Sequence, residues 1–205
     1  MSETPLTVFA LVCTLKSSPE KSSSELLASQ LLERFAQHGA TGESLRTADF
    51  RIARGVTENE GDGDEWPTIR ERILAADILV VSAPIWMGHA SSEAYRVLER
   101  LDAELGNHDD EGRAILAGKV AVTAIVGNED GAHKATADLY QGLADVGFSI
   151  PSQGGTYWTG QAMKTVDYND LEHTPREVSN ANDLVVTNAA HLARVLRDNP
   201  YPPRG

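Results

Sequence analysis

Cysteine and basic residues are scarce in this sequence. Cys13 is its single cysteine, so no internal disulfide bond can form, as is usual in a reducing compartment. Lysines and arginines number 18 against 30 aspartates and glutamates, giving a formal net charge of -12, which disfavours contact with nucleic acids and anionic membranes. No apolar stretch approaches the roughly 20 residues that span a bilayer, and the N-terminal residues resemble a strand more than a signal peptide. The sequence therefore predicts a cytoplasmic protein with no nucleic-acid partner and no membrane insertion.

Several catalytic and binding motifs are also missing. The sequence has neither GxGxxG nor a GK[ST] loop, which argues against dinucleotide-binding and nucleotidase functions. It lacks the GxSxG turn of serine hydrolases, and its histidines show no HExxH or CxxC-like grouping that would indicate a metal site. The acidic stretch 58–65 lacks the spacing of a calcium loop, so we expect it to be solvated. A phosphorylation receiver domain needs acidic residues at the end of its first strand. This sequence has Cys13 and Thr14 there, which argues against a receiver domain.

Short apolar runs alternate with helical patterns along the chain. Three runs, 7–13, 77–83 and 119–126, are apolar at nearly every position, which is typical of strands buried on both faces of a parallel sheet. Weaker candidates for strands are 43–48 and 148–150, and the second candidate extends towards Gly154. The runs alone therefore predict five strands.

Amphipathic stripes separate these runs and predict five helices, within 27–35, 69–74, 94–101, 135–143 and 178–196. The last begins with Thr174 as N-cap, Pro175 at N1 and Glu177 at N3, and Asn199-Pro200 ends it. This alternation predicts an α/β protein with a three-layer, doubly wound, five-stranded parallel sheet in the flavodoxin-like order 2-1-3-4-5. We expect one domain over 1–205, with an ordered core of about 6–198 and a tail at 199–205.

A serine-rich turn, "TLKSSPEKSSS", follows the first predicted strand. In such a sheet, ligands bind beyond the carboxyl ends of the strands where the strand order reverses, and a helix N-terminus there attracts anions. Ser22 with Glu25 is typical of a capping box, and a plain serine cap is one interpretation. The turn holds more donors than a cap needs, which favours a site for a single phosphate at Thr14, Lys16, Ser17, Ser22, Ser23 and Ser24.

Two further loops are expected at the same edge of the sheet. After the third strand come Pro84, Ile85, Trp86, Met87 and Gly88, in which Trp86 is either a flat exposed surface or a core aromatic. After the fourth strand comes either a plain tight turn or a polar wall made by Gly127, Asn128, Glu129, Asp130, Gly131 and His133. Together the three loops suit a ligand with one phosphate and a planar heteroaromatic ring, such as FMN.

The sequence resembles the flavodoxin-like NAD(P)H-dependent FMN reductase and quinone reductase superfamily. The resemblance is carried by the serine-rich turn, by "GDEWPTIRERILAADILVVSAPIWMG" and by "GNEDGAH", and it covers nearly the whole chain. It implies that Lys16, Ser17 and Ser22 to Ser24 bind the FMN phosphate. It also implies that Pro84 to Gly88 bind the ribityl chain and isoalloxazine, and that Gly127 to His133 pack against the flavin. Many members carry a GSxR-type first loop, where this chain has Thr14-Leu15-Lys16-Ser17.

The resemblance implies hydride transfer from NAD(P)H to FMN and onward to a quinone, flavin or other small acceptor. Backbone N–H groups of 84–88 would stabilise negative charge on the reduced ring, and no side chain is assigned as catalytic. Tyr157 and Trp158 are either walls of the substrate cavity, in this subunit or a partner's, or a packing pair. A homodimer or homotetramer is expected. Two alternatives remain open: a flavodoxin-type electron carrier without NAD(P)H turnover, and a member that kept the fold and lost FMN.

Overall fold

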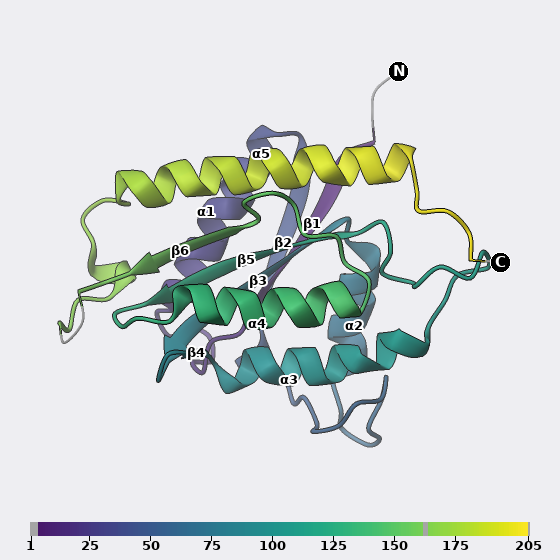
Figure 1. Ribbon diagram of the computed structural model, residues 1–205. Coiled ribbons are helices and arrows are strands. Elements are labelled where there is room, and N and C mark those ends of the chain that lie inside the picture. The colour runs from purple at the N-terminus through teal and green to yellow at the C-terminus, as the bar shows by residue number, and fades with distance from the viewer. Residues whose placement is uncertain (1–3, 162–163, 205) are drawn as a thin grey trace.

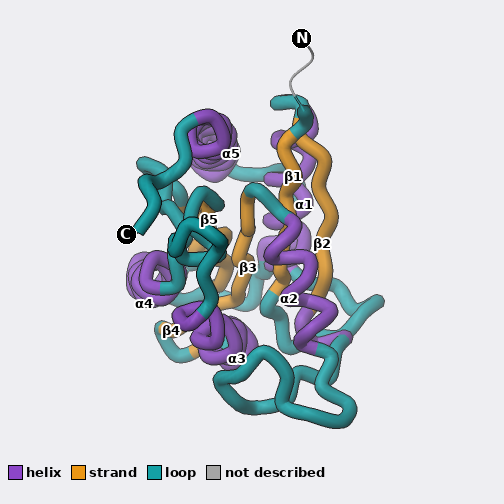
Figure 2. The backbone as a smooth tube through the Cα atoms, turned by 90° about the vertical axis from the view of Figure 1, so that its right-hand side faces the viewer, coloured by secondary structure: helices purple, strands orange, loops and turns teal. Residues whose placement is uncertain are grey.

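The computed structural model describes residues 4–161 and 164–204 (Figure 1). Five parallel strands form the sheet in the order β2-β1-β3-β5-β6, and a short sixth strand, β4, pairs antiparallel with the end of β3. The parallel strands follow the predicted order, so the predicted fold is confirmed; Figure 2 shows β5, β3, β1 and β2 side by side. Their bounds are β1 (Leu6–Val12), β2 (Ala40–Arg46), β3 (Ile78–Trp86), β4 (His89–Ala90), β5 (Val120–Gly127) and β6 (Gly155–Thr159).

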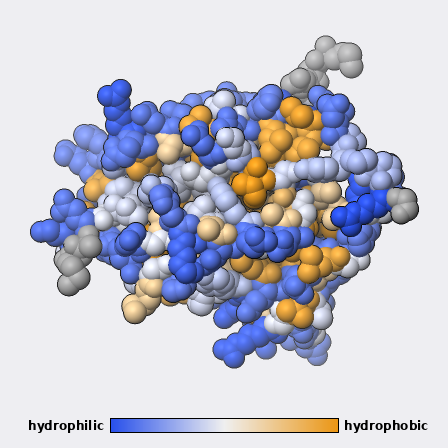
Figure 3. Space-filling view, viewed as in Figure 1, coloured by the Kyte–Doolittle hydropathy of each residue, from blue (hydrophilic) through white to orange (hydrophobic). Residues whose placement is uncertain are grey.

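Helices cover both faces of the sheet. One face carries α2 (Trp66–Ala75), α3 (Ser92–Leu101) and α4 (Ala132–Asp145), and the other carries α1 (Ser23–Gln37) and α5 (Arg176–Asp198). Short 3-10 helices are η1 (Thr47–Asp49), η2 (Asp102–Gly106) and η3 (Tyr168–Asp170). Hydrophilic residues cover most of the face drawn in Figure 3, with apolar residues in separate groups. None of the helices in the described part of the chain combines the length and apolarity that a membrane crossing requires.

Burial of the sheet on both faces explains the unbroken apolar runs. In β1, Phe9 and Leu11 pack into the core under α2 and α3, while Val8 and Ala10 pack into the core under α1 and α5. All four side chains are buried. Successive residues of a strand point to opposite faces, so a strand between two helical layers needs apolar residues at every position.

The structure corrects the bounds of two predicted strands. The fifth strand is Gly155–Thr159 and not 148–150, because a turn closed by the hydrogen bond from Gly154 N to Pro151 O, with Gln153 at a φ of 51°, separates the two segments. Ser149 makes only an isolated bridge with Val120. β2 begins at Ala40, three residues earlier than predicted.

The start of α5 also differs from the prediction. Pro175 is the N-cap and Arg176 the first helical residue, with no side-chain cap. The Thr174 hydroxyl instead accepts a hydrogen bond of 2.9 Å from the Gln30 side chain, which ties this segment to α1. At the other end, the chain beyond α5 contacts the body through the bond from Arg204 N to Glu111 O and through Tyr201, whose hydroxyl lies 2.8 Å from Ser149 Oγ.

Candidate cofactor-binding site

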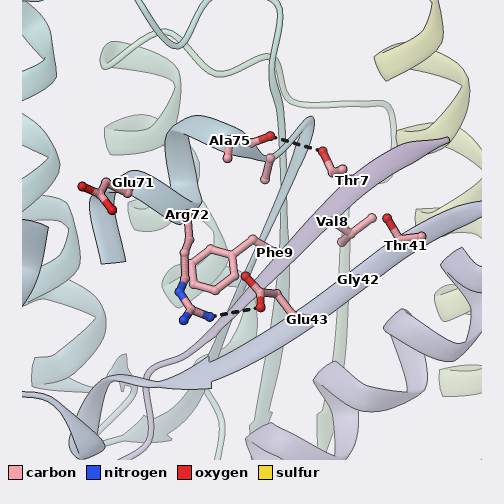
Figure 4. A pocket seen from close by; sticks show the side chains of 10 residues that line it. Thr7, Val8, Phe9, Thr41, Gly42, Glu43, Glu71, Arg72 and Ala75 are labelled. Atoms are coloured by element: carbon pink, nitrogen blue, oxygen red, sulfur yellow. Dashed lines mark hydrogen bonds and ion pairs between the residues drawn. The ribbon is translucent and has the colours of Figure 1, made fainter. Parts of the chain in front are cut away.

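Two hollows lie at opposite ends of the strands, one at their amino ends and one at their carboxyl ends. The groove in Figure 4, of about 500 Å³, lies over the first residues of β1 and β2 beside α2. Arg72, the cation among its lining residues, pairs with Glu43 at 3.0 Å, and Glu71 adds a second carboxylate. A cleft of about 210 Å³ lies instead at the carboxyl ends of β1, β3 and β5. The cleft is the better candidate for a ligand, because it stands where the strand order reverses and faces a helix N-terminus.

The serine turn forms one end of this cleft. Ser22 is the N-cap of α1, and its Oγ accepts a 3.3 Å hydrogen bond from Glu25 N. Within the described residues, the hydroxyls of Ser22, Ser23 and Ser24 donate no hydrogen bond to another group of the protein. The first turn of α1 adds backbone N–H groups that the helix itself leaves unpaired. This end of the cleft is therefore rich in unused donors.

The predicted capping box is only half formed. The Glu25 carboxylate does not return to the N-cap; it pairs with the Arg46 guanidinium at the end of β2, with Arg46 Nε 2.8 Å from Glu25 Oε1. Arg46 is 5% exposed, and the hydrogen bond to Glu25 raises the pKa of its guanidinium. Its Nη1 also donates to the carbonyl oxygens of Lys16 at 3.3 Å and Ser17 at 3.0 Å. Arg46 thus fixes the serine turn from behind.

Arg46 was missed by the sequence reasoning. The available signal was its place at the carboxyl end of a strand next to β1, but nothing local in the sequence links it to Glu25 or to the turn. Asp49 adds a second tie, since its carboxylate accepts from the backbone and hydroxyl of Ser18 at 2.7 Å each.

The structure brings together ten of the predicted site residues around the cleft: Thr14, Lys16, Ser22, Ser23, Ser24, Pro84, Ile85, Trp86, Gly127 and Asn128. It does not place the other seven in the lining: Ser17, Met87, Gly88, Glu129, Asp130, Gly131 and His133. The lining also contains residues that the site prediction left out: Leu15, Val126, Trp158, Asp167 and Tyr168.

A hairpin lies beside the cleft, and its turn holds two of the seven residues outside the lining. β3 extends to Trp86, so Pro84 to Trp86 belong to a strand and not to a loop. Met87 and Gly88 form the two-residue turn to β4, with φ angles of 53° and 75°. The Met87 N–H donates to Glu129 Oε1 at 3.0 Å. It is therefore not available to stabilise charge on a bound ring, the role expected for the backbone N–H groups of 84–88. The turn at Gly88 and the loop after β5 pack closely: a Cβ added to Gly131 would lie 2.7 Å from Gly88.

The aromatic residues divide between two faces of β6. Trp158 lies in the cleft, with its ring 5.4 Å from that of Tyr168. Tyr157 lies on the other face, edge-on to His133 at 5.1 Å, and lines a separate hollow. Tyr157 and Trp158 therefore do not wall one cavity of this chain. Trp86 is 53% exposed, so its interpretation as a core aromatic is wrong.

These residues fit FMN in chemistry. The donors of the serine turn suit a phosphate, Lys16 can supply a positive charge, and Trp86 and Trp158 offer flat apolar surfaces for a ring. The volume of the cleft is about 210 Å³, below the roughly 300–1,000 Å³ of complete ligand sites. Bound FMN would therefore extend beyond the cleft. Cys13 takes no part: it is fully buried at the end of β1, and burial raises the pKa of its thiol.

Comparison with known proteins decides the family. The family model described as NADPH-dependent FMN reductase matches residues 7–164. The chain belongs to this family. The match confirms the predicted superfamily and the expected class, an FMN-associated oxidoreductase with a nicotinamide donor.

Individual relatives of this family member include flavin-handling proteins. An 8-demethyl-8-aminoriboflavin-5'-phosphate synthase of Streptomyces davaonensis is 31% identical over 208 residues, covering 96% of this chain and 80% of that protein. A crystal structure of RosB with the bound intermediate 8-demethyl-8-formylriboflavin-5'-phosphate is 30% identical, with a TM-score of 0.87 over 96% of this chain and 82% of that chain. A flavodoxin from Streptococcus, 14% identical with a TM-score of 0.56, supports the fold alone.

A further relative is longer than this FMN reductase family member. A protein named divalent metal cation transporter MntH, of Mycobacterium bovis, is 35% identical over 191 residues. These residues are 90% of this chain but 28% of that protein. The chain thus spans about a quarter of that relative's length, and the relative's name describes far more sequence than the two share.

Proposed function

We propose that this protein binds FMN in the cleft and transfers a hydride from NAD(P)H through it to a quinone, free flavin or other small acceptor. The observation that carries the proposal is the position of the serine turn. It joins unused hydroxyl donors and the N-terminus of α1 at the carboxyl edge of the sheet, in a chain that belongs to the NADPH-dependent FMN reductase family.

The residues of this chain would divide the work of binding. Ser22, Ser23, Ser24 and the first turn of α1 would hold the phosphate, with Lys16 beside it. Arg46 would keep the turn in place, and Trp86 with Trp158 would contact the ring. FMN, when bound, supplies the electron-accepting ring; the protein supplies binding, orientation and exclusion of water.

The test is reduction of the bound flavin. Purified protein is loaded with FMN, freed of excess, and mixed with NADH or NADPH without oxygen. We expect the yellow absorbance band to bleach and to return when a quinone is added. A flavin that stays bound and oxidised with both nicotinamides would contradict the proposal and favour the flavodoxin-type carrier. A protein that takes up no FMN would favour the alternative in which the cofactor has been lost.

A second candidate follows from the synthase relative, which covers 96% of this chain and is named for a modified riboflavin 5'-phosphate. In that function FMN would be the substrate rather than a resident cofactor. Mass spectrometry of the flavin recovered after turnover separates the two: unchanged FMN supports the reductase, and an altered mass supports flavin modification.

We also infer that the protein acts as a cytoplasmic homodimer or homotetramer. Trp86, Met87 and Leu15 leave apolar surface exposed around a cleft that is small for FMN. A second copy that covers this surface would enlarge the site. Light scattering after size exclusion is expected to give at least twice the mass of one chain, and a monomeric mass at micromolar concentration would contradict the inference.

A further inference from the structure

One wall of the cleft lies outside the part of the chain that matches the family. The match ends at residue 164, and the wall is made by Asp167 and Tyr168 at the start of η3. Tyr168 anchors this wall, since its buried hydroxyl donates to Gln30 Oε1 of α1 at 2.8 Å. The backbone N–H of Asn169 lies 3.4 Å from Ser23 Oγ. The wall is thus joined to the first half of α1, next to the predicted phosphate end.

Asp167 places a carboxylate in this wall. Its Oδ1 accepts a 3.3 Å hydrogen bond from Asn128 Nδ2, at the carboxyl end of β5. Asp167 is also the N-cap of η3 and forms a capping box with Asp170, in which its backbone N–H donates to Asp170 Oδ2 at 3.1 Å. The carboxylate therefore lies between the serine turn on one side and the end of β5 on the other.

Asp167 is exposed, so its carboxylate can accept further hydrogen bonds from a ligand in the cleft. An ionised Asp only accepts hydrogen bonds, and it would repel a phosphate that approached closely. The cleft therefore has donors at the serine turn and an acceptor farther along, towards Asn128. A ligand that matches this order carries an anion at one end and hydroxyl groups next to it. The ribityl phosphate of FMN has this arrangement.

We propose that Asp167 is a specificity-determining residue that accepts hydrogen bonds from the ribityl hydroxyls and selects flavin phosphates whose linking chain is a polyol. The proposal rests on the proposed function, because it takes FMN as the ligand of the cleft. A hydrogen bond to a charged group contributes enough to change affinity by about 10- to 100-fold.

The experiment compares two ligands by fluorescence titration. One is FMN, and the other is a flavin phosphate with a plain alkyl chain in place of the ribityl chain. We expect the unmodified protein to bind FMN about tenfold or more tightly than the alkyl analogue. Asp167→Ala should weaken FMN binding by about 10- to 100-fold and leave analogue binding nearly unchanged, and Asp167→Asn, which keeps one accepting oxygen, should fall between.

Glu172→Gln is the matched control, since Glu172 is an exposed carboxylate in the same segment that does not line the cleft. It should leave both affinities unchanged. If Asp167→Ala weakens or strengthens both ligands equally, the residue acts through charge or structure and the proposal is overturned. Equal binding of both ligands by the unmodified protein would also overturn it while sparing the proposed function. Binding of neither would overturn both.

Discussion

Two polar segments follow neighbouring strands at the same edge of the sheet, and they use their polar groups differently. The acidic loop (residues 53–65) lies beyond β2, and its carboxylates are engaged by its own backbone and by α3. Asp64 accepts from the backbone N–H groups of Ala53, Glu60 and Trp66 and pairs with Arg100 at 2.8 Å. In the serine turn beyond β1, the hydroxyls of Ser22, Ser23 and Ser24 donate no hydrogen bond to another described group of the protein. Polar groups satisfied within the fold stabilise it, and those left unused are available to a ligand.

Arg100 is central to the acidic loop. It is fully buried on α3, donates to the carbonyl oxygens of Ala53 at 2.9 Å and Thr57 at 2.8 Å, and lies 5.6 Å from the centre of the Trp66 ring. The loop was expected to be solvated, and most of its residues are exposed, but the Asp64 side chain is 1% exposed. The expectation therefore fails at Asp64.

The largest expected effect is on stability. Arg100→Met leaves the buried Asp64 carboxylate without its cation and two carbonyl oxygens without a donor. We expect urea unfolding to show a loss of about 3–5 kcal/mol. FMN affinity should not change in the folded variant, because neither Arg100 nor the acidic loop lines the cleft. A loss below about 1 kcal/mol would show that the pair contributes no more than a surface ion pair.

A change behind the serine turn should weaken FMN binding, whereas the change in the acidic loop should lower stability. Arg46→Gln removes the fork that holds Glu25 and the carbonyl oxygens of Lys16 and Ser17, so the turn loses its fixed shape. We expect the FMN dissociation constant to rise about tenfold. Arg46→Lys keeps the charge without the planar fork and should give an intermediate value. Unchanged FMN affinity in both variants would mean that Arg46 does not organise the turn.

Acid should weaken the acidic loop in a defined range of pH. Burial by itself raises the pKa of Asp64, but hydrogen bonds from backbone amides and from Arg100 outweigh it and lower the pKa from 3.8 to about 2. A lowered pKa in the folded state means that this contribution is present above about pH 4 and is lost as the pH falls towards 2. As the pH falls through this range, the urea midpoint of Asp64→Asn should fall less steeply than that of the unmodified protein. Parallel curves for the two proteins would contradict the assignment.

The smallest effect is expected at the opposite edge of the sheet. Arg72 and Glu43 in the groove of Figure 4 form an exposed pair, with side chains 40% and 58% exposed. Arg72→Met should therefore cost less than about 1 kcal/mol and leave FMN binding unchanged. Weaker FMN binding in this variant would move the candidate site from the cleft to the groove.

The fold was predictable because its strands are buried on both faces. That burial produces the apolar runs at β1, β3 and β5, and the right-handed crossovers then leave few strand orders. β6 was misplaced because its five residues, GTYWT, include no aliphatic side chain, while Phe148 and Ile150 flank Ser149 in the alternating pattern of a strand. The position of the serine turn could be predicted, because it follows directly from the strand order.

The details of the site depend on contacts that the sequence does not display. Arg46 reaches the turn from β2, and Asp167 reaches the cleft from a segment after β6. No local pattern joins residues so far apart along the chain. The residues from Glu129 to His133 were grouped with the cleft because they follow β5, but their position in the chain does not fix where their side chains point. The structure shows Glu129 bonded to the hairpin and His133 in contact with Tyr157.

The central claim is that the serine turn recognises a phosphate, and a comparison of FMN with riboflavin tests it most directly. The two ligands differ only in the phosphate group. Fluorescence titration should show FMN binding at least about 100-fold more tightly than riboflavin, since charge-assisted hydrogen bonds to the turn are lost with the phosphate. In the variant with Ser22, Ser23 and Ser24 replaced by alanine, this preference should fall by at least about tenfold. Equal affinities for FMN and riboflavin in the unmodified protein would contradict the account.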